Sequence, residues 1–145
     1  MNFPKLGNPK LVYEPMPPVR KPELENTKSI ISVIQKKDFL LHHPYHSFAY
    51  YIKMLREAAI DPKVKSIKIT IYRVASESKV VHALINAAQN GKKVTAVVEL
   101  RARFDERSNI NWSRQMEEAG INVIFGVPGL KVHGKLTLIT THAEG

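Results

Sequence analysis

Cysteine is absent from the 145 residues of this chain. Its absence excludes a disulfide framework and any metal site built on thiolates, and it favours a reducing compartment. Long apolar runs are missing too, because no stretch approaches the roughly 20 apolar residues of a membrane-spanning helix. The N-terminus also lacks the apolar segment of a signal peptide. With 43% hydrophobic residues, the composition is ordinary for a soluble globular domain.

Acidic side chains are scarce relative to basic ones. The chain has 13 acidic and 22 basic residues, which gives a formal net charge of +9. Such an excess suggests a polyanionic partner, namely nucleic acid, anionic lipid or a phosphate-rich substrate. A basic surface that only keeps the protein soluble explains the charge about equally well. Charge alone therefore leaves the choice of partner open.

Proline marks the first boundary in the chain. Six of the nine prolines fall within residues 4–22, and the segment EPMPPVRKPE is not expected to carry a regular helix. We interpret residues 1–26 as a proline-rich tail or linker from a preceding domain. Residues 27–145 are then expected to form one domain.

Helical and strand-like patterns alternate after the tail. Helical spacing predicts a short helix capped at Asn26 or Thr27, helices over 47–60 and 78–90, and a helix from Ser108 to Gly120. Strand-like segments fall at 38–43, 66–72, 93–100, 121–126 and 135–140. The continuous apolar run KVTAVVEL is typical of a strand covered on both faces. The order predicts an α/β domain with a mostly parallel sheet flanked by helices and a final antiparallel strand.

This order brings basic side chains towards one edge of the sheet. Three strands are linked through helices and should run parallel, whereas the connection after Gly126 is too short for a parallel crossover. If the last strand pairs with its predecessor, it must run antiparallel and begin at the carboxyl edge, where open α/β sheets bind ligands. Arg73 ends the first of these strands, and Arg101 and Arg103 follow the second. Arg73 and one or both of the later arginines are therefore expected to converge with His133 and Lys135 on a site for an anion such as phosphate.

The chemistry of this edge depends on the stretch GLKVHGKLTLI, residues 129–139. A neutral imidazole of His133 beside phosphate-binding cations is equipped to attack phosphorus and form a phosphohistidine. Lys135 would share the strand face of His133 and could neutralise charge on the transferring group. A lone His-x-Lys is more often the start of a surface strand, and the predicted convergence of cations narrows this preference without reversing it.

Four segments together carry a family resemblance: HPYHSF, IYRVASES, NGKKVTAVVELRARFDE and EAGINVIFGVPGLKVHGKL. They resemble the polyphosphate kinases over about residues 38–140. The resemblance implies a phospholipase D-like fold, in which two similar halves each bring a histidine to a shared site. It also implies reversible transfer of the γ-phosphate of ATP to polyphosphate through a phosphohistidine, with Mg²⁺. Thr140 stands where phospholipase D motifs have aspartate, and polyphosphate kinases lack that aspartate as well.

The resemblance also assigns roles by matching position. His133 corresponds to the histidine that becomes phosphorylated, and Arg73 and Arg103 correspond to a magnesium–phosphate site. Because a guanidinium has no free lone pair for a cation, we expect these arginines to contact metal-bound phosphates. Asp105 and Glu106 could hold Mg²⁺ through water or could pair with the neighbouring arginines, and pairing is the favoured interpretation.

The parent enzyme implied by the resemblance is longer than this chain. We expect an excised piece that stops at Gly145, lacks the head domain and need not retain the parent's activity. The partners implied are ATP, ADP and polyphosphate. The parent is expected to be a cytoplasmic homo-oligomer. Peripheral association with the inner face of the membrane is compatible with this expectation.

Two other functional classes are considered. A nucleic-acid-binding module would need exposed aromatic rings among its basic residues, whereas Tyr45, Phe48 and Tyr51 are interpreted as helix-face core. A phosphodiesterase is disfavoured by Thr140. Neither alternative is preferred to the kinase.

Further side chains receive structural interpretations. Three histidines lie near the proline turn, namely His42, His43 and His46. We do not expect them to bind a metal, because they fall on a strand end, a turn and a helix start, which would place their rings apart. His82 is interpreted as structural, and Trp112 and Met116 as core.

Overall fold

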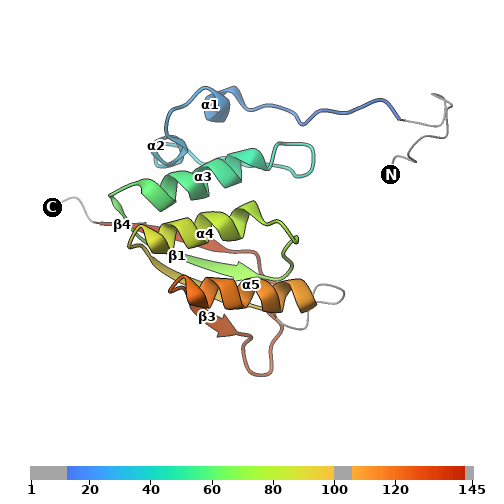
Figure 1. Cartoon of the computed structure of the whole chain (residues 1–145). Helices are drawn as coiled ribbons and strands as arrows, with labels where there is room; N and C mark the ends of the chain where they lie inside the picture. Colours follow the sequence, from blue (N-terminus) through green and yellow to red (C-terminus); the bar gives the residue numbers. More distant parts are fainter. Residues whose placement is uncertain (1–12, 100–105, 143–145) are drawn as a thin grey trace.

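The computed structural model describes residues 13–99 and 106–142. Its helices are α1 (Pro22–Glu25), α2 (Ile30–Ile34), α3 (Ala49–Ile60), α4 (Lys79–Gln89) and α5 (Glu106–Glu118). Its strands are β1 (Val64–Ile71), β2 (Lys93–Val98), β3 (Asn122–Phe125) and β4 (Thr137–Thr141). The helices from α3 onwards lie against one mixed sheet (Figure 1). In the described part of the chain, no helix combines the length and the apolar character needed to cross a bilayer.

The sheet has the strand order β3-β2-β1-β4. β1 pairs with β2 and β2 with β3 in parallel, whereas β4 pairs with β1 in antiparallel. This confirms the predicted α/β architecture with a mostly parallel sheet and a final antiparallel strand.

The partner of β4 differs from the one assumed in the sequence analysis. β4 lies beside β1, with Thr137 opposite Ile69, and not beside its predecessor β3. Two strands separate β3 from β4, roughly 14 Å at the usual spacing. Residues 126–136 span this distance by running along the carboxyl ends of the strands between. The loop that carries His133 therefore crosses the whole carboxyl edge of the sheet.

One face of the sheet is buried under α3, α4 and α5 (Figure 1). Ile67 of β1, Leu55 of α3 and Leu84 of α4 are each 0% exposed. Trp112 and Met116 of α5 are 5% and 0% exposed, which confirms the prediction that they belong to the core. The burial pattern of β2 accordingly alternates along its length, with every second side chain buried.

The opposite face of the sheet is open. Thr95 and Val97 of β2 are only half-buried, and Ile124 of β3 and Leu138 of β4 are 42% and 58% exposed. The prediction that β2 is covered on both faces is therefore wrong for the described residues. The apolar run predicted a strand correctly but did not reveal that only alternate side chains meet a helix.

Helix boundaries follow capping side chains. Ser78 caps the N-terminus of α4, and its Oγ accepts a hydrogen bond of 3.3 Å from the amide of Val81. Asn90 caps the C-terminus of the helix and is followed by Gly91, which has a φ of 78°. Both boundaries agree with the sequence prediction. A positive φ favours glycine because it has no Cβ.

Other boundaries differ from prediction. Ser29, not Asn26 or Thr27, caps α2. Ser108 lies inside α5, because that helix already begins at Glu106. The strand predicted at 38–43 does not form, since this segment has no strand partner in the described chain. Residues 22–25, within the predicted tail, form the single turn α1.

Packing explains the turn of α1. Proline at its first position has a backbone already suited to a helix start. Leu24 is 2% exposed and packs in a small cluster with Ile30 and Tyr50. The hydroxyl of Tyr50 also accepts a hydrogen bond of 3.0 Å from the amide of Lys21.

Candidate functional site

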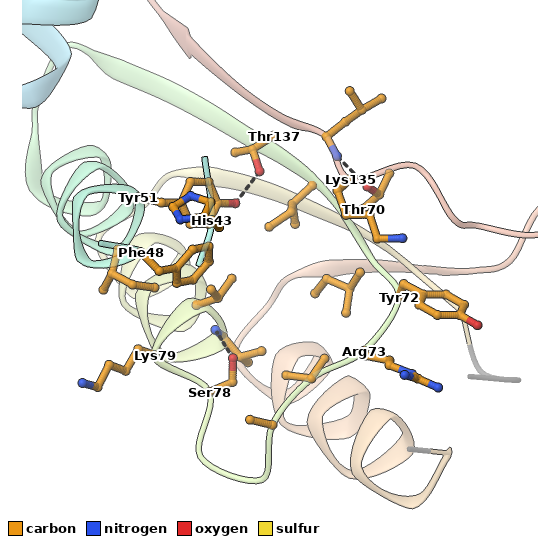
Figure 2. A pocket seen from close by; sticks show the side chains of 18 of the residues that line it. His43, Phe48, Tyr51, Thr70, Tyr72, Arg73, Ser78, Lys79, Lys135 and Thr137 are labelled. Carbon is orange, nitrogen blue, oxygen red and sulfur yellow. Dashed lines mark hydrogen bonds between the residues drawn. The ribbon is translucent and has the colours of Figure 1, made fainter. Parts of the chain in front are cut away.

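A cavity of about 1000 Å³ opens at the carboxyl end of β1 (Figure 2). His133, Lys135 and Arg73 all line it. The structure thus brings three of the predicted site residues to one end of the sheet. Arg101 and Arg103 lie outside the described residues.

His133 and Lys135 do not lie on a strand, contrary to the sequence interpretation, because β4 begins only at Thr137. They belong to the loop that crosses the carboxyl edge. Thr70 of β1 holds this loop: its Oγ1 donates to the carbonyl of Gly134 at 2.6 Å and accepts from the amide of Leu136 at 2.9 Å. The backbone is therefore fixed on both sides of Lys135.

A buried carboxylate holds the same loop on the other side of His133. Glu99 directly follows β2 and is 8% exposed, and its Oε2 accepts a hydrogen bond of 3.0 Å from the amide of Val132. Val132 itself is buried, at 7% exposure. The loop is thus bonded to the carboxyl ends of β1 and β2, and the exposed side chain of His133 lies between the two attachments.

The ring of Tyr72 is the centre of the polar part of the cavity. It meets the ring of His133 at a centroid distance of 4.6 Å and an interplanar angle of 83°. Three cations surround the same ring: Lys135 Nζ at 4.8 Å, Arg73 Cζ at 5.6 Å and Lys131 Nζ at 5.9 Å. The electron-rich face of a tyrosine attracts cations, so it offsets part of their mutual repulsion.

The positive charges around the ring of Tyr72 suit the binding of an anion. His133, Lys135 and Arg73 are all exposed, so a bound anion would remain close to water and its attraction would weaken with salt. Lys135 Nζ donates a hydrogen bond of 2.5 Å to the carbonyl of His133 and leaves two protons for other acceptors. Lys79, at the start of α4, lines the same cavity.

The other end of the cavity is aromatic and apolar, with His43, Phe48 and Tyr51 (Figure 2). The hydroxyls of Tyr51 and Thr137 are 2.6 Å apart and share a hydrogen bond between α3 and the start of β4. Burial raises the pKa of the Tyr51 phenol above its ordinary value of 10.0, and the hydrogen bond to Thr137 partly opposes this shift.

Two of the aromatic residues interpreted as helix-face core are exposed. Tyr45 and Phe48 are 56% and 51% exposed, and both precede the first residue of α3. Only Tyr51 is half-buried. The predicted burial of these rings, which was the argument against a nucleic-acid-binding module, therefore does not hold for Tyr45 and Phe48.

The described residues do not fit a resident magnesium ion. They contain no group of three or more histidine, cysteine or acidic side chains that could hold a metal, whereas Mg²⁺ prefers oxygen ligands. The cations around Tyr72 would also repel a bare metal ion. Asp105 and the side chain of Glu106 lie outside the described part of the chain. The described cations suit the phosphate oxygens that would carry a metal.

The remaining histidines make local contacts. His46 Nδ1 accepts a hydrogen bond of 2.8 Å from the amide of His42, and His43 Nδ1 lies 3.0 Å from the carbonyl of His46. The exposed ring of His82 meets the edge of Trp112 at 5.2 Å, which joins α4 to α5.

Four residues of this region were not predicted from the sequence: Thr70, Tyr72, Glu99 and Asn109, whose Nδ2 donates to the carbonyls of Tyr72 and Glu99. A weak signal existed for two of them. Glu99 is a carboxylate at the end of an apolar run, and Asn109 falls on the helical stripe of Trp112 and Met116, where an apolar residue would be expected. A polar group in a core position needs a partner, but the sequence does not tell which one.

Comparisons with known proteins agree on one family. The family model "Polyphosphate kinase C-terminal domain 1" matches residues 29–145. A polyphosphate kinase of Vibrio vulnificus strain YJ016 is 50% identical over 142 residues, covering 98% of this chain and 20% of that protein. A polyphosphate kinase of Escherichia coli strain K12 is 47% identical over 147 residues, covering 100% of this chain and 21% of that protein.

A solved structure is similar as well. The crystal structure of polyphosphate kinase from Porphyromonas gingivalis matches with a TM-score of 0.81 and 44% sequence identity. The match covers 97% of this chain and 24% of that one. The chain therefore spans about a fifth of the length of the curated relatives it matches.

Proposed function

Because the chain belongs to the polyphosphate kinase family, we propose that it supplies one half of a phosphoryl-transfer site, with His133 as the nucleophile. The observation that carries this proposal is the position of an exposed imidazole at the carboxyl edge of the sheet, with Lys135, Arg73 and Lys131 around the tyrosine ring that it touches. A histidine in such surroundings can accept a phosphoryl group whose charge the cations offset.

The reaction proceeds in two balanced steps. A lone pair of the His133 ring attacks the γ-phosphorus of ATP, the bond to the β–γ bridging oxygen breaks, and ADP leaves with that oxygen. A terminal phosphate oxygen of polyphosphate then attacks the same phosphorus. The phosphorus–nitrogen bond breaks, the polymer gains one phosphate, and the imidazole is restored.

Arg73 and Lys135 would bind the non-bridging oxygens of the phosphoryl group during both steps. We assign the same role to Arg103 and Arg101, which lie outside the described residues. Mg²⁺ would arrive on the phosphates of the nucleotide as part of the substrate, since the described residues do not fit a resident ion.

Thr140 adds an argument against hydrolytic chemistry. It lies on β4 opposite Ser66 and faces the open side of the sheet. It does not line the cavity that contains His133. A carboxylate at that position is a feature of the phosphodiesterase motif, and this chain has none there.

Nucleotide positioning is expected to need more polypeptide than this chain contains. A displacement of about 1 Å can cost on the order of a hundredfold in rate. We therefore propose that residues 1–145 do not autophosphorylate detectably with Mg-ATP, whereas a protein of the full length of the relatives does so at His133.

Labelling with γ-³²P ATP tests the proposal. The full-length protein should acquire label that is acid-labile and base-stable, and mass spectrometry under alkaline conditions should locate it on His133. The His133→Ala variant should take up none. Label that persists in this variant would contradict the assignment, as would stoichiometric label on residues 1–145 alone.

A further inference from the structure

We propose that Asn109 is a positioning residue for His133. This inference rests on the proposed role of His133 as a nucleophile. Asn109 lies on α5 and does not line the cavity that contains His133. It would act through two other residues. Glu99 holds the loop on the β2 side, and Tyr72 contacts the ring of His133.

The side chain of Asn109 joins the carboxyl ends of two strands. Asn109 is 1% exposed, and its Nδ2 donates to the carbonyl of Tyr72 at 2.9 Å and to the carbonyl of Glu99 at 2.8 Å. Tyr72 directly follows β1, and Glu99 directly follows β2. A backbone bond of 2.9 Å also joins these two segments, from the amide of Glu99 to the carbonyl of Ile71. One amide group therefore adds a side-chain connection between the segments next to this backbone bond.

Both bonded residues contact the loop of His133 through their side chains. The ring of Tyr72 meets the ring of His133 at 4.6 Å, and the carboxylate of Glu99 holds the amide of Val132. The two side chains can support His133 only if their backbones keep a fixed separation. Asn109 bonds both backbones with a single rigid amide, so the position of the imidazole depends on it.

A purely structural role is the competing explanation. A buried amide group needs hydrogen-bond partners whatever its function, because an unsatisfied polar group in the core is costly. The Nδ2 of Asn109 has two such partners, whereas its Oδ1 has none among the described residues. The two explanations differ in what a variant should change. A structural residue affects only the fraction of folded protein, whereas a positioning residue changes the behaviour of His133 in protein that is folded.

Phosphoramidate is a suitable probe, because it phosphorylates histidine without a nucleotide. A lone pair of a ring nitrogen forms the new phosphorus–nitrogen bond, and the phosphorus–nitrogen bond of phosphoramidate breaks. The nitrogen of the reagent leaves as ammonia, and solvent supplies and takes up the protons that are exchanged. The exposed His42, His82 and His142 act as internal standards in the same molecule. The readout is the rate at His133 divided by the rate at these standards, measured by mass spectrometry at a temperature where each variant is folded.

Asn109→Asp is the decisive variant. It keeps the shape of the side chain but replaces both donor protons by an acceptor that faces two carbonyl oxygens. We expect the relative rate at His133 to fall about tenfold, in line with the sensitivity of such reactions to small displacements. The matched control is Ser113→Ala, because Ser113 is also buried on α5, at 2% exposure, and its Oγ has no hydrogen-bond partner among the described residues. This control should keep the wild-type ratio.

A nuclear Overhauser contact between the rings of Tyr72 and His133 supplies a second readout. The contact should be present in the wild type and in Ser113→Ala, and it should weaken in Asn109→Asp. Folded Asn109→Asp that keeps both the ring contact and the relative rate would overturn the proposal.

A variant at a buried amide can fail to fold, so Tyr72 supplies a second test. Tyr72→Phe keeps the aromatic ring and should retain the preference for His133, whereas Tyr72→Leu should lose it. An unchanged ratio in Tyr72→Leu would overturn the proposal, because the ring through which Asn109 acts would then be irrelevant. If the wild type shows no preference for His133, the proposed nucleophile is contradicted, and the ring contact alone decides the role of Asn109.

Discussion

The two faces of the sheet are built from the same strands but differ in what their side chains contact. On the helix-covered face, Ile67 of β1 is fully buried in one core cluster with Leu55 of α3 and Leu84 of α4, which are fully buried as well. On the open face, Leu138 of β4 is 58% exposed, and Leu136 in the loop just before β4 is 70% exposed. Apolar side chains stabilise a fold in proportion to the area that they remove from water. The leucines of the two faces are therefore chemically alike but should contribute very differently to the stability of this chain.

The largest expected effect is on the covered face. Leu84→Ala removes a side chain that is 0% exposed and should lower the free energy of unfolding by about 2–5 kcal/mol, because it leaves a cavity as well as losing burial. Urea denaturation followed by circular dichroism measures the change. Leu138→Ala is the matched control on the open face and should change stability by less than about 0.5 kcal/mol. Equal losses for the two variants would show that the open face is covered in solution.

Much of the covered face could be predicted from the sequence. The alternation of Ile67, Ile69 and Ile71 indicates a strand, and the helical stripe of Trp112 and Met116 indicates a buried helix face. These signals are local, because they depend only on the spacing of side chains along one element. The openness of the other face could not be predicted, since an apolar run such as that of β2 has the same appearance whether one or both of its faces are covered.

The candidate site was only partly predictable for the same reason. The directions of the strands were sufficient to place Arg73 and His133 at the same edge of the sheet. The length of the final connection indicated an antiparallel strand but not that it pairs with β1. The bonds of Thr70, Glu99 and Asn109 connect residues far apart in the chain, and no local pattern encodes such partners.

A smaller effect is expected where the covering helix α4 begins. Ser78→Ala removes the hydroxyl that accepts from the amide of Val81, and loss of such a cap typically costs about 1 kcal/mol. Thermal denaturation should show a lower midpoint than in the wild type. Ser76→Ala, at an exposed position outside the helix, is the control and should leave the midpoint unchanged. A comparable loss in the control would point to a general effect of the 76–78 turn instead of the cap.

Tyr51 lies where the covering helix α3 meets the start of β4, and removal of its hydroxyl tests this contact. Tyr51→Phe loses the hydrogen bond to Thr137 and should cost about 0.5–1.5 kcal/mol at neutral pH. The control is Tyr45→Phe, because Tyr45 is 56% exposed.

The pH dependence of stability tests the same residue. The pKa of Tyr51 is raised in the folded protein above its ordinary value of 10.0, so the unfolded chain ionises first as the pH rises. The contribution of Tyr51 is therefore complete below pH 10.0 and is lost as the pH rises through the folded-state pKa. Tyr51→Phe should show a shallower decline of stability above pH 10.0 than the wild type. An identical decline would indicate that Tyr51 ionises equally easily in both states.

The smallest expected effect is on the open face, where a charge should be tolerated. Leu138 of β4 lies directly opposite Lys68 of β1 in the antiparallel pair. Leu138→Glu would place opposite charges across the two strands, an arrangement that contributes about 0.2–1 kcal/mol. The variant is therefore expected to be as stable as the wild type or slightly more stable at low salt. Raising the salt concentration should remove the gain, because both groups are exposed to screening, and Leu138→Gln should show no salt-dependent gain. A clear destabilisation by Leu138→Glu at low salt would mean that the open face makes apolar contacts in solution, and the difference between the two faces would then be smaller than the exposures indicate.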